Sequence, residues 1–251
     1  MYPELLRDGC HGTICQQLAW ARAIKKAFQA DESRLVLIPN FIDKSVSSNL
    51  PIIPKLILLS DHHDGHAYLG IDFNFMNEGE GNSIFNELIA LKWDQPKRKN
   101  GSLLTRKVLW FSDTKYAYGG IEHNPCSTWP PILNVLKDKL NSMFGSNINS
   151  VLLNLYENKN HCVNFHSDNE KIFGNEPVIF SLSFGGERTF VLAKKSNANM
   201  NNSSSIHIPM NSGTLIVMAG LTQKYWVHMV KKPNGPFIER INVTFREVKP
   251  L

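Results

Sequence analysis

Apolar residues recur along this chain at two spacings, one typical of helices and one typical of strands. The helical spacing is clearest over residues 129–145, where proline stands at the start and Gly145 follows the last turn. The same spacing predicts helices over residues 13–28 and 84–93. The stripe that we expect the 129–145 helix to bury consists of Ile132, Leu133, Leu136, Leu140 and Phe144.

Short apolar runs and alternating polar and apolar residues fill much of the remaining chain. Turn-forming residues separate these runs, as they do between the strands of a sheet. Many short strands with turns between them indicate a sandwich or barrel of the jelly-roll kind. The predicted fold is therefore mainly β with flanking helices (α+β). The runs predicted as strands are 34–42, 151–156, 178–184, 188–192, 205–208, 213–218, 225–230 and 240–246.

Composition places the chain among ordinary globular proteins. Its 251 residues are enough for one large domain with a sizeable core, and 42% of them are hydrophobic and 20% charged. No apolar run approaches the roughly 20 residues that span a bilayer, and the N-terminus lacks the pattern of a signal peptide. We therefore expect a single domain over residues 1–251, a monomer located in the nucleus or cytoplasm, and no membrane partner.

Net charge and cysteine spacing slightly restrict the possible partners and the cellular compartment. A net charge of +5 allows a polyanionic partner without proving one. The four cysteines lack zinc-type spacing, which favours free thiols in a reducing compartment over disulfides. They are Cys10, Cys15, Cys126 and Cys162.

Two polar residues close to the strand over 151–156 form the first candidate site. His166 and Asp168 are two positions apart, and in an extended strand that spacing points both side chains to one face. The best candidate for a third metal ligand is His228. Two histidines and one carboxylate with open positions suit non-haem Fe(II). The alternative is a His-x-Asp pair that only forms hydrogen bonds within a turn.

The last predicted strand supplies the second candidate site. Over residues 240–246 it places Arg240, Asn242, Thr244 and Arg246 on one face. Two inward-pointing arginines need anionic partners, because an unpaired buried charge is very costly. A dicarboxylate cosubstrate would satisfy both through bidentate hydrogen bonds. The alternative is an edge strand with a solvated polar face.

With these residues, the sequence resembles the AlkB-like family of Fe(II)/2-oxoglutarate-dependent dioxygenases, in particular its members that repair nucleic acids. The resemblance covers roughly residues 84–246, and its most specific motif is Arg-x-Asn-x-Thr-x-Arg over residues 240–246. It implies a double-stranded β-helix (jelly-roll) core buttressed by N-terminal helices. It also implies that His166, Asp168 and His228 bind the catalytic iron.

The resemblance further implies a site for 2-oxoglutarate and one for a base. Arg240 is expected to hold the distal carboxylate of 2-oxoglutarate, and Arg246 with Asn154 the end nearer the metal. Tyr118 is expected to stack on an extruded base. The implied 2-oxoglutarate contacts are Asn154, Tyr156, Arg240, Asn242 and Arg246. The implied substrate contacts are Arg106, Trp110, Tyr116, Tyr118 and Glu170.

Three of these substrate contacts have a structural alternative. Trp110 and Tyr116 fit ordinary strand packing nearly as well, and Glu170 could pair with Arg188 or Lys171 instead. The implied reaction is oxidative demethylation of N-alkylated nucleobases in DNA or RNA, as in the repair of alkylation damage. It uses Fe(II), 2-oxoglutarate and O2.

Residues 43–82 depart from the family pattern, in which a segment like that at residues 38–41 leads straight into a helix. We interpret 43–82 as a probable insertion before a catalytic core of about 84–248, since a structureless loop of this length is uncommon. It includes an apolar stretch over 50–59 and a glycine-bearing turn over 77–81. Within it, 61–66 carries a second His-x-Asp pair, for which a polar surface turn is favoured over a metal site.

Two other functions stay open at this point. One is the same oxygenase chemistry on a protein or small molecule, and the other is a catalytically silent module that binds nucleic acid. The aromatic residues near Tyr118 favour a base over the first. The intact set of predicted metal ligands and arginines favours an enzyme over the second. The basic loop Lys97-Arg98-Lys99 is a candidate for phosphate contacts, although such runs are usually just solvated.

Overall fold

The computed structural model describes residues 55–195, 205–233 and 235–249. The predicted helix over 13–28 and the predicted strand over 34–42 lie outside the described residues. The first described strands are β1 (Lys55–His62), β2 (Gly65–Asp72), β3 (Lys107–Ser112), β4 (Tyr116–Tyr118) and β5 (Ile121–His123). The later strands are β6 (Ser150–Tyr156), β7 (Val163–His166), β8 (Ile179–Gly185), β9 (Arg188–Lys194), β10 (Ile206–Met210), β11 (Leu215–Gly220), β12 (Trp226–Val230) and β13 (Arg240–Arg246). The helical elements are α2 (Glu78–Ile89), α3 (Pro131–Phe144), the 3-10 turn η2 (Lys171–Phe173) and α4 (Thr222–Tyr225).

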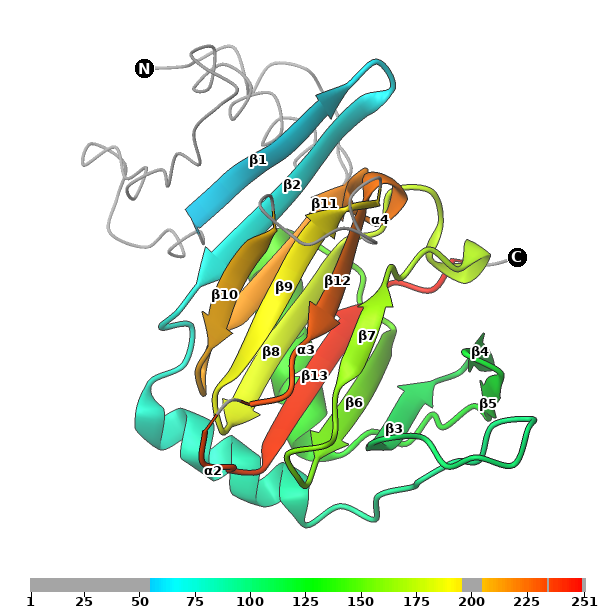
Figure 1. Ribbon diagram of the computed structural model, residues 1–251, viewed down its shortest axis with the longest axis vertical. Helices are drawn as coiled ribbons and strands as arrows, with labels where there is room; N and C mark the ends of the chain where they lie inside the picture. The colour runs from blue at the N-terminus through cyan, green and yellow to red at the C-terminus, as the bar shows by residue number, and fades with distance from the viewer. Residues whose placement is uncertain (1–54, 196–204, 234, 250–251) are drawn as a thin grey trace.

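Two antiparallel sheets lie one in front of the other and form the centre of the molecule (Figure 1). The larger sheet has the strand order β1-β2-β11-β8-β13-β6-β3, and the smaller one has the order β10-β9-β12-β7. From β6 to β13 the described chain passes back and forth between the sheets, and β9 and β10 alone follow each other within one. This winding is a double-stranded β-helix, so the predicted jelly-roll fold, mainly β with flanking helices, is confirmed.

Alternating residues of the larger sheet pack in two directions, as the period of a strand requires. One set, such as Leu153 and Val243, packs with Leu133, Leu136 and Leu140 of α3 and with buried residues of α2. The other set, such as Ile216 and Met218, packs against the smaller sheet. Polar side chains of β6, β8 and β13, such as Asn154, Ser183 and Arg240, point the second way, so buried polar groups lie between the sheets.

The prediction for α3 is confirmed, and the prediction for α2 is wrong at both ends. The predicted turn over 77–81 is the first turn of α2, and the helix ends at Ile89 rather than near residue 93. Asn77 and Glu80 form a reciprocal capping box, which stabilises this start despite two glycines. Gly81 is needed for packing, because a Cβ there would lie 2.8 Å from Ser212 Oγ.

The described part of the predicted insertion is not a loop. β1 and β2 form a hairpin, and β2 pairs with β11, so this β1–β2 hairpin extends the larger sheet (blue and cyan in Figure 1). Ala67, Leu69 and Ile71 of β2 are buried with residues of both sheets. The hairpin is therefore part of the core, although whether it is an insertion relative to the family stays a prediction. None of the helices among the described residues combines the length and apolar character needed to span a bilayer.

Candidate active site

The three predicted metal ligands converge where β7 ends. His166 is the last residue of β7, and it lies directly opposite His228 in the β7–β12 ladder. Asp168 follows two residues later, so the turn after the strand brings its carboxylate to the two imidazoles. One ligand atom of each residue lies within 4.8 Å of the others. In the described part of the chain this is the one group of three such residues that could hold a metal ion.

Neighbouring groups orient two of these side chains. His166 Nδ1 lies 2.8 Å from the carbonyl oxygen of Asn164, which fixes the proton on Nδ1 and leaves Nε2 available as a ligand. That Nε2 lies 3.6 Å from Asp168 Oδ1. The other carboxylate oxygen, Oδ2, accepts hydrogen bonds from Nε of Arg246, at 3.0 Å, and from its Nη2. His166 Nε2 and Asp168 Oδ1 are thus the atoms left to bind a metal ion.

The electrostatic environment favours the forms that bind a metal. Burial alone would raise the pKa of Asp168, but Arg246, His228 and His166 together hold it well below its usual range. Burial and the neighbouring His166 lower the pKa of His228 to about 3. At neutral pH the group therefore offers a carboxylate and a neutral imidazole, the states that coordinate Fe(II).

β13 is an interior strand, so the alternative of an exposed edge strand is wrong. It pairs with β6 on one side and β8 on the other, and all seven of its residues are buried. Arg240 is 1% exposed and Arg246 is 3% exposed. In the described structure, the Nη1 atom of each guanidinium is buried without a hydrogen-bond partner. Arg246 already has an anionic partner in Asp168, whereas Arg240 has no ion pair among the described residues. A buried guanidinium without a counter-charge requires an anion, and a dicarboxylate such as 2-oxoglutarate supplies one while also reaching the free donor of Arg246.

The surroundings of Arg240 hold its guanidinium in one orientation. Its Nε donates to Ser183 Oγ at 2.8 Å, and its guanidinium carbon lies 5.2 Å from the ring centroid of Tyr156. Tyr156 stands opposite Arg240 in the β6–β13 ladder. These contacts leave the Nη1 edge as the free donor edge, which is the geometry that a carboxylate needs.

The remaining predicted 2-oxoglutarate contacts are engaged with protein groups. Asn154 Oδ1 accepts a hydrogen bond from Arg106 Nε. Asn242 Nδ2 donates to Ser181 Oγ at 2.8 Å and to the Leu182 carbonyl at 2.9 Å. Their direct contact with 2-oxoglutarate stays a prediction, and the structure shows that Asn154 and Asn242 are held by hydrogen bonds within the protein.

The predicted substrate contacts gather around the two-stranded β4–β5 sheet. Arg106 Nη2 donates to Tyr118 Oη at 3.3 Å, and Tyr116 Oη donates to Glu170 Oε1 at 3.0 Å. Trp110 and Tyr116 are 5% and 2% exposed and pack with Phe173, so the strand-packing alternative describes them well. Tyr118 is partly exposed.

The two rings stacked on Tyr118 do not lie on opposite faces of it. Its ring centroid is 5.1 Å from that of Tyr116 and 5.3 Å from that of His123, and those two are 6.1 Å apart. The three rings thus form a triangle and not a row, so Tyr116 and His123 do not cover both faces of Tyr118.

Glu170 does not pair with Arg188, which was one alternative for it. Arg188 is buried and donates to the backbone carbonyls of Asn158, His161 and Lys231. Burial, followed by the charge of Asp168, raises the pKa of Glu170. Its Oε2 is buried without a partner in the described structure, so one carboxyl oxygen is free for a ligand.

Two secondary candidates have simple outcomes. In the second His-x-Asp segment, His62 bonds to Ser60 Oγ and Asp64 pairs with Lys224, as expected for a surface turn. The basic loop at 97–99 is a tight turn in which Arg98 Nη1 donates to the Leu103 carbonyl at 3.1 Å. Lys115, followed by the charge of Lys99, lowers the pKa of Glu122, so the loop lies close to β5.

Sequence reasoning missed the residues that support the site. These are Asn164 behind His166, Ser183 behind Arg240, His123 beside Tyr118, and Gln223, whose Oε1 accepts the Asp168 N–H at 2.8 Å. The acceptor behind His166 is the main-chain carbonyl of Asn164, so the type of that side chain left no signal. His123 is close to Tyr118 in the sequence, whereas Ser183 and Gln223 lie 57 and 55 residues from their partners and left no local pattern.

Comparisons with known proteins agree with this geometry. A family model described as "2OG-Fe(II) oxygenase superfamily" matches residues 74–246. The human protein "Alpha-ketoglutarate-dependent dioxygenase alkB homolog 3" is 39% identical over 149 residues, which are 58% of this chain and 52% of that protein. Its Bos taurus counterpart is 35% identical over 184 residues, covering 70% of this chain and 64% of that protein.

A third relative, "DNA oxidative demethylase ALKBH2" of Arabidopsis thaliana, is 35% identical over 157 residues. That match covers 54% of this chain and 49% of the relative. The chain thus spans between about half and two thirds of the length of these relatives.

Proposed function

The chain belongs to the 2OG-Fe(II) oxygenase superfamily, and from that premise we propose that it oxidatively demethylates N-alkylated nucleobases in DNA or RNA. The observation that carries the proposal is the direct contact between two sites, since Arg246 pairs with the predicted metal ligand Asp168. A His-Asp-His group that could hold a metal lies next to two buried arginines with unpartnered Nη1 atoms. A metal and a dicarboxylate are the two ligands that such a pair of sites fits.

His166, Asp168 and His228 would hold Fe(II), and Arg240 and Arg246 would hold 2-oxoglutarate. Bound Fe(II), with 2-oxoglutarate and O2, supplies the oxidising chemistry that hydroxylates an N-methyl group, which then leaves as formaldehyde. The protein's own contribution is orientation. Arg246 fixes the Asp168 carboxylate through Oδ2, and Ser183 and Tyr156 fix Arg240, so both ligands meet groups that are already placed.

A nucleobase is the substrate that the residues around the β4–β5 sheet favour. Tyr118 offers a partly exposed ring, and base stacking on such a ring is worth roughly 1–3 kcal/mol. The free oxygen of Glu170 suits the exocyclic amine or N–H edge of a base. The names of two relatives, an alkB homolog and a DNA oxidative demethylase, support the same substrate class.

Succinate and formaldehyde measurements would test this proposal. The protein is supplied with Fe(II), 2-oxoglutarate and O2, with an N-methylated oligonucleotide, with the same unmethylated oligonucleotide, or with none. We expect succinate and formaldehyde in equal amounts, and strong stimulation by the methylated oligonucleotide alone. Equal succinate in all three samples would mean that the oxygenase acts on a substrate other than a methylated nucleobase. No succinate in any sample would overturn the enzymatic proposal.

A further inference from the structure

Asp168 lies just beyond the sheet that holds the two histidines. The last ladder pair of β7 and β12 at this end joins His166 to His228, and Asp168 follows two residues later. The strand ladder therefore does not fix the main chain of Asp168. That main chain needs a separate support, because a carboxylate displaced by even 1 Å changes the distance to a metal by half a typical bond length.

Gln223 provides this support from the other ligand-bearing segment. Its Oε1 accepts a hydrogen bond from the Asp168 N–H at 2.8 Å, and the side chain is 2% exposed. Gln223 belongs to α4, which runs directly into β12, so it stands five residues before His228. One hydrogen bond thus connects the segment that carries Asp168 to the segment that carries His228.

The β1–β2 hairpin holds α4 in place. Thr222 Oγ1 accepts a hydrogen bond from the Tyr68 N–H at 3.0 Å, and the Leu221 N–H donates to the His66 carbonyl at 2.8 Å. Gly220, at φ 60°, permits this approach, because a Cβ there would lie 2.2 Å from the His66 carbonyl oxygen. At the tip of the hairpin, Asp64 pairs with Lys224 at 2.5 Å.

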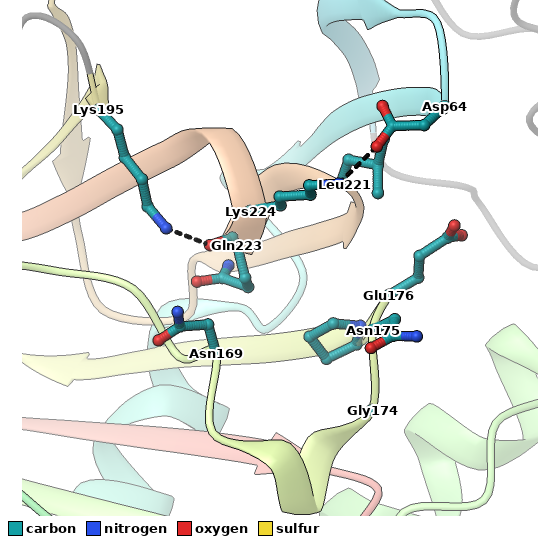
Figure 2. A pocket seen from close by; sticks show the side chains of 10 residues that line it. Asp64, Asn169, Gly174, Asn175, Glu176, Lys195, Leu221, Gln223 and Lys224 are labelled. Carbon is teal, nitrogen blue, oxygen red and sulfur yellow. Dashed lines mark hydrogen bonds and ion pairs between the residues drawn. The ribbon is translucent and has the colours of Figure 1, made fainter.

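A polar pocket borders this connection (Figure 2). It has a volume of about 560 Å³, and Asn169, Gln223, Lys224 and Asp64 are among its lining residues. Figure 2 shows Lys195 reaching toward α4, where its Nζ donates to the Gln223 carbonyl at 2.9 Å. Since the pocket reaches Asn169, the residue after Asp168, water would compete for the Asp168 N–H if the Gln223 acceptor were absent.

We propose that Gln223 is a positioning residue that fixes the main chain of Asp168 relative to His228, and that the β1–β2 hairpin stabilises it through α4. The metal-binding consequence rests on the proposed function, since it takes Asp168 and His228 as ligands. The hydrogen bond itself does not, so the two can be tested separately.

Two isosteric variants separate the acceptor from the shape of the side chain. Gln223→Met fills a similar volume and removes the acceptor oxygen, whereas Gln223→Glu keeps both. Gln95→Met is the matched control, because Gln95 also hydrogen-bonds to the backbone, at the Leu104 carbonyl, away from the metal group. Mn(II) is the probe, since carboxylate sites accept it and air does not oxidise it as it does Fe(II).

We expect Gln223→Met to raise the dissociation constant for Mn(II) about 10-fold, the lower end for the loss of a group behind a metal ligand. Gln95→Met should stay close to wild type, and Gln223→Glu, which keeps the acceptor but adds a negative charge, should keep slow Asp168 exchange and bind Mn(II) no more weakly than wild type. Amide hydrogen exchange in the metal-free protein should be faster at Asp168 in Gln223→Met alone. Equal Mn(II) affinity and equal Asp168 exchange in wild type and Gln223→Met would overturn the inference, as would equal losses in the Met and Glu variants.

The two proposals fail in different ways. If wild-type protein binds no Mn(II), the proposed function fails, and the Asp168 exchange rates then decide the role of Gln223 by themselves. If wild type binds Mn(II) and Gln223→Met binds it equally well, the proposed function stands and the inference fails. A Thr222→Val variant extends the test to the hairpin, and it should weaken Mn(II) binding in the same direction as Gln223→Met but less.

Discussion

The metal group and the β4–β5 sheet are close, since Tyr116 donates to Glu170 two residues after Asp168, yet they are built in different ways. On the metal and arginine side, the ladders of β6, β7, β12 and β13 place His166, His228 and the two arginines, and Asp168 follows in a turn. The substrate side stands on a hairpin of two three-residue strands and on Glu170 in a loop, held by side-chain contacts. Strand ladders fix positions to a fraction of an ångström, whereas a short hairpin depends on a few contacts. We therefore expect single substitutions at the metal and arginine sites to lower turnover more than single substitutions around the β4–β5 sheet change the substrate preference.

The largest effect is expected at the metal group. His166→Ala should abolish 2-oxoglutarate turnover and leave the fold intact, because the side chain is 39% exposed. Asp168→Ala should also abolish turnover. It leaves the buried Arg246 without its anionic partner, so it should cost about 3–5 kcal/mol of stability as well. Succinate assays and urea unfolding of both variants measure this difference. Near-wild-type turnover in His166→Ala would refute the assignment of the metal site.

The next effect concerns the cosubstrate. Arg240→Ala should weaken 2-oxoglutarate binding by about 1.5–3 kcal/mol, which is roughly 10- to 150-fold. Arg240→Lys keeps the charge but loses the planar fork, so its affinity for 2-oxoglutarate should fall between those of wild type and Arg240→Ala. Titration calorimetry with 2-oxoglutarate gives both values. Lys107→Ala, which removes a surface cation paired with Glu157, is the control and should bind normally.

On the substrate side, Tyr118→Ala should lower demethylation of a bound methylated base, in line with roughly 1–3 kcal/mol of lost stacking. Tyr118→Phe removes the hydroxyl that meets Arg106 but keeps the ring, so it should retain most activity. Formaldehyde release from saturating oligonucleotide measures the effect. If Tyr118→Ala demethylates normally, the base does not stack there.

Substitutions in the basic loop should change the affinity for the oligonucleotide and not the rate of demethylation. The double variant Lys97→Gln/Lys99→Gln spares Arg98, which holds the turn together. Each lost phosphate contact should reduce the slope of log affinity against log salt by about 0.7–0.9. Fluorescence anisotropy at several salt concentrations measures the slope. Lys137→Gln/Lys139→Gln on α3 is the matched control, and an equal slope change in both variants would mean that the loop has no special role.

The smallest effect is at the tip of the β1–β2 hairpin. The hydrogen bond from Lys224 lowers the pKa of Asp64 from 3.8 to about 2. Because the folded pKa is depressed, the stabilisation is complete above the unfolded value and is lost as the pH falls toward the folded value. Wild type should be slightly more stable than Asp64→Asn at pH 7 and 5, and the difference should shrink at pH 3. Urea unfolding at these three pH values tests the trend, and a difference that grows toward pH 3 would contradict it.

Much of this architecture could be predicted from the sequence because it follows local rules. The period of two in residues 240–246 predicted which side chains of β13 share a face, and proline and glycine predicted the ends of α3. The glycines at 79 and 81 were misleading, since the capping box of Asn77 and the packing against Ser212 outweigh their low helix propensity.

The supporting contacts could not be predicted, for a physical reason. Gln223 and Asp168 are 55 residues apart, and Tyr68 and Thr222 are 154 apart. Such pairs depend on how the strands are ordered in the sheets, and no spacing along the chain records that order. The pairing of β2 with β11, which joins the β1–β2 hairpin to the larger sheet, belongs to the same class.

One measurement tests the central claim, that the His166, Asp168 and His228 group and the two buried arginines bind a metal and 2-oxoglutarate together. It is a crystal structure of the protein grown with Mn(II) and 2-oxoglutarate without O2, with the metal located by its anomalous signal. We expect Mn(II) bound by His166 Nε2, Asp168 Oδ1 and His228, and a 2-oxoglutarate carboxylate on the free Nη1 edge of Arg240. A metal bound elsewhere, for example at His62 or His66 of the hairpin, or a 2-oxoglutarate that does not touch Arg240, would contradict the account.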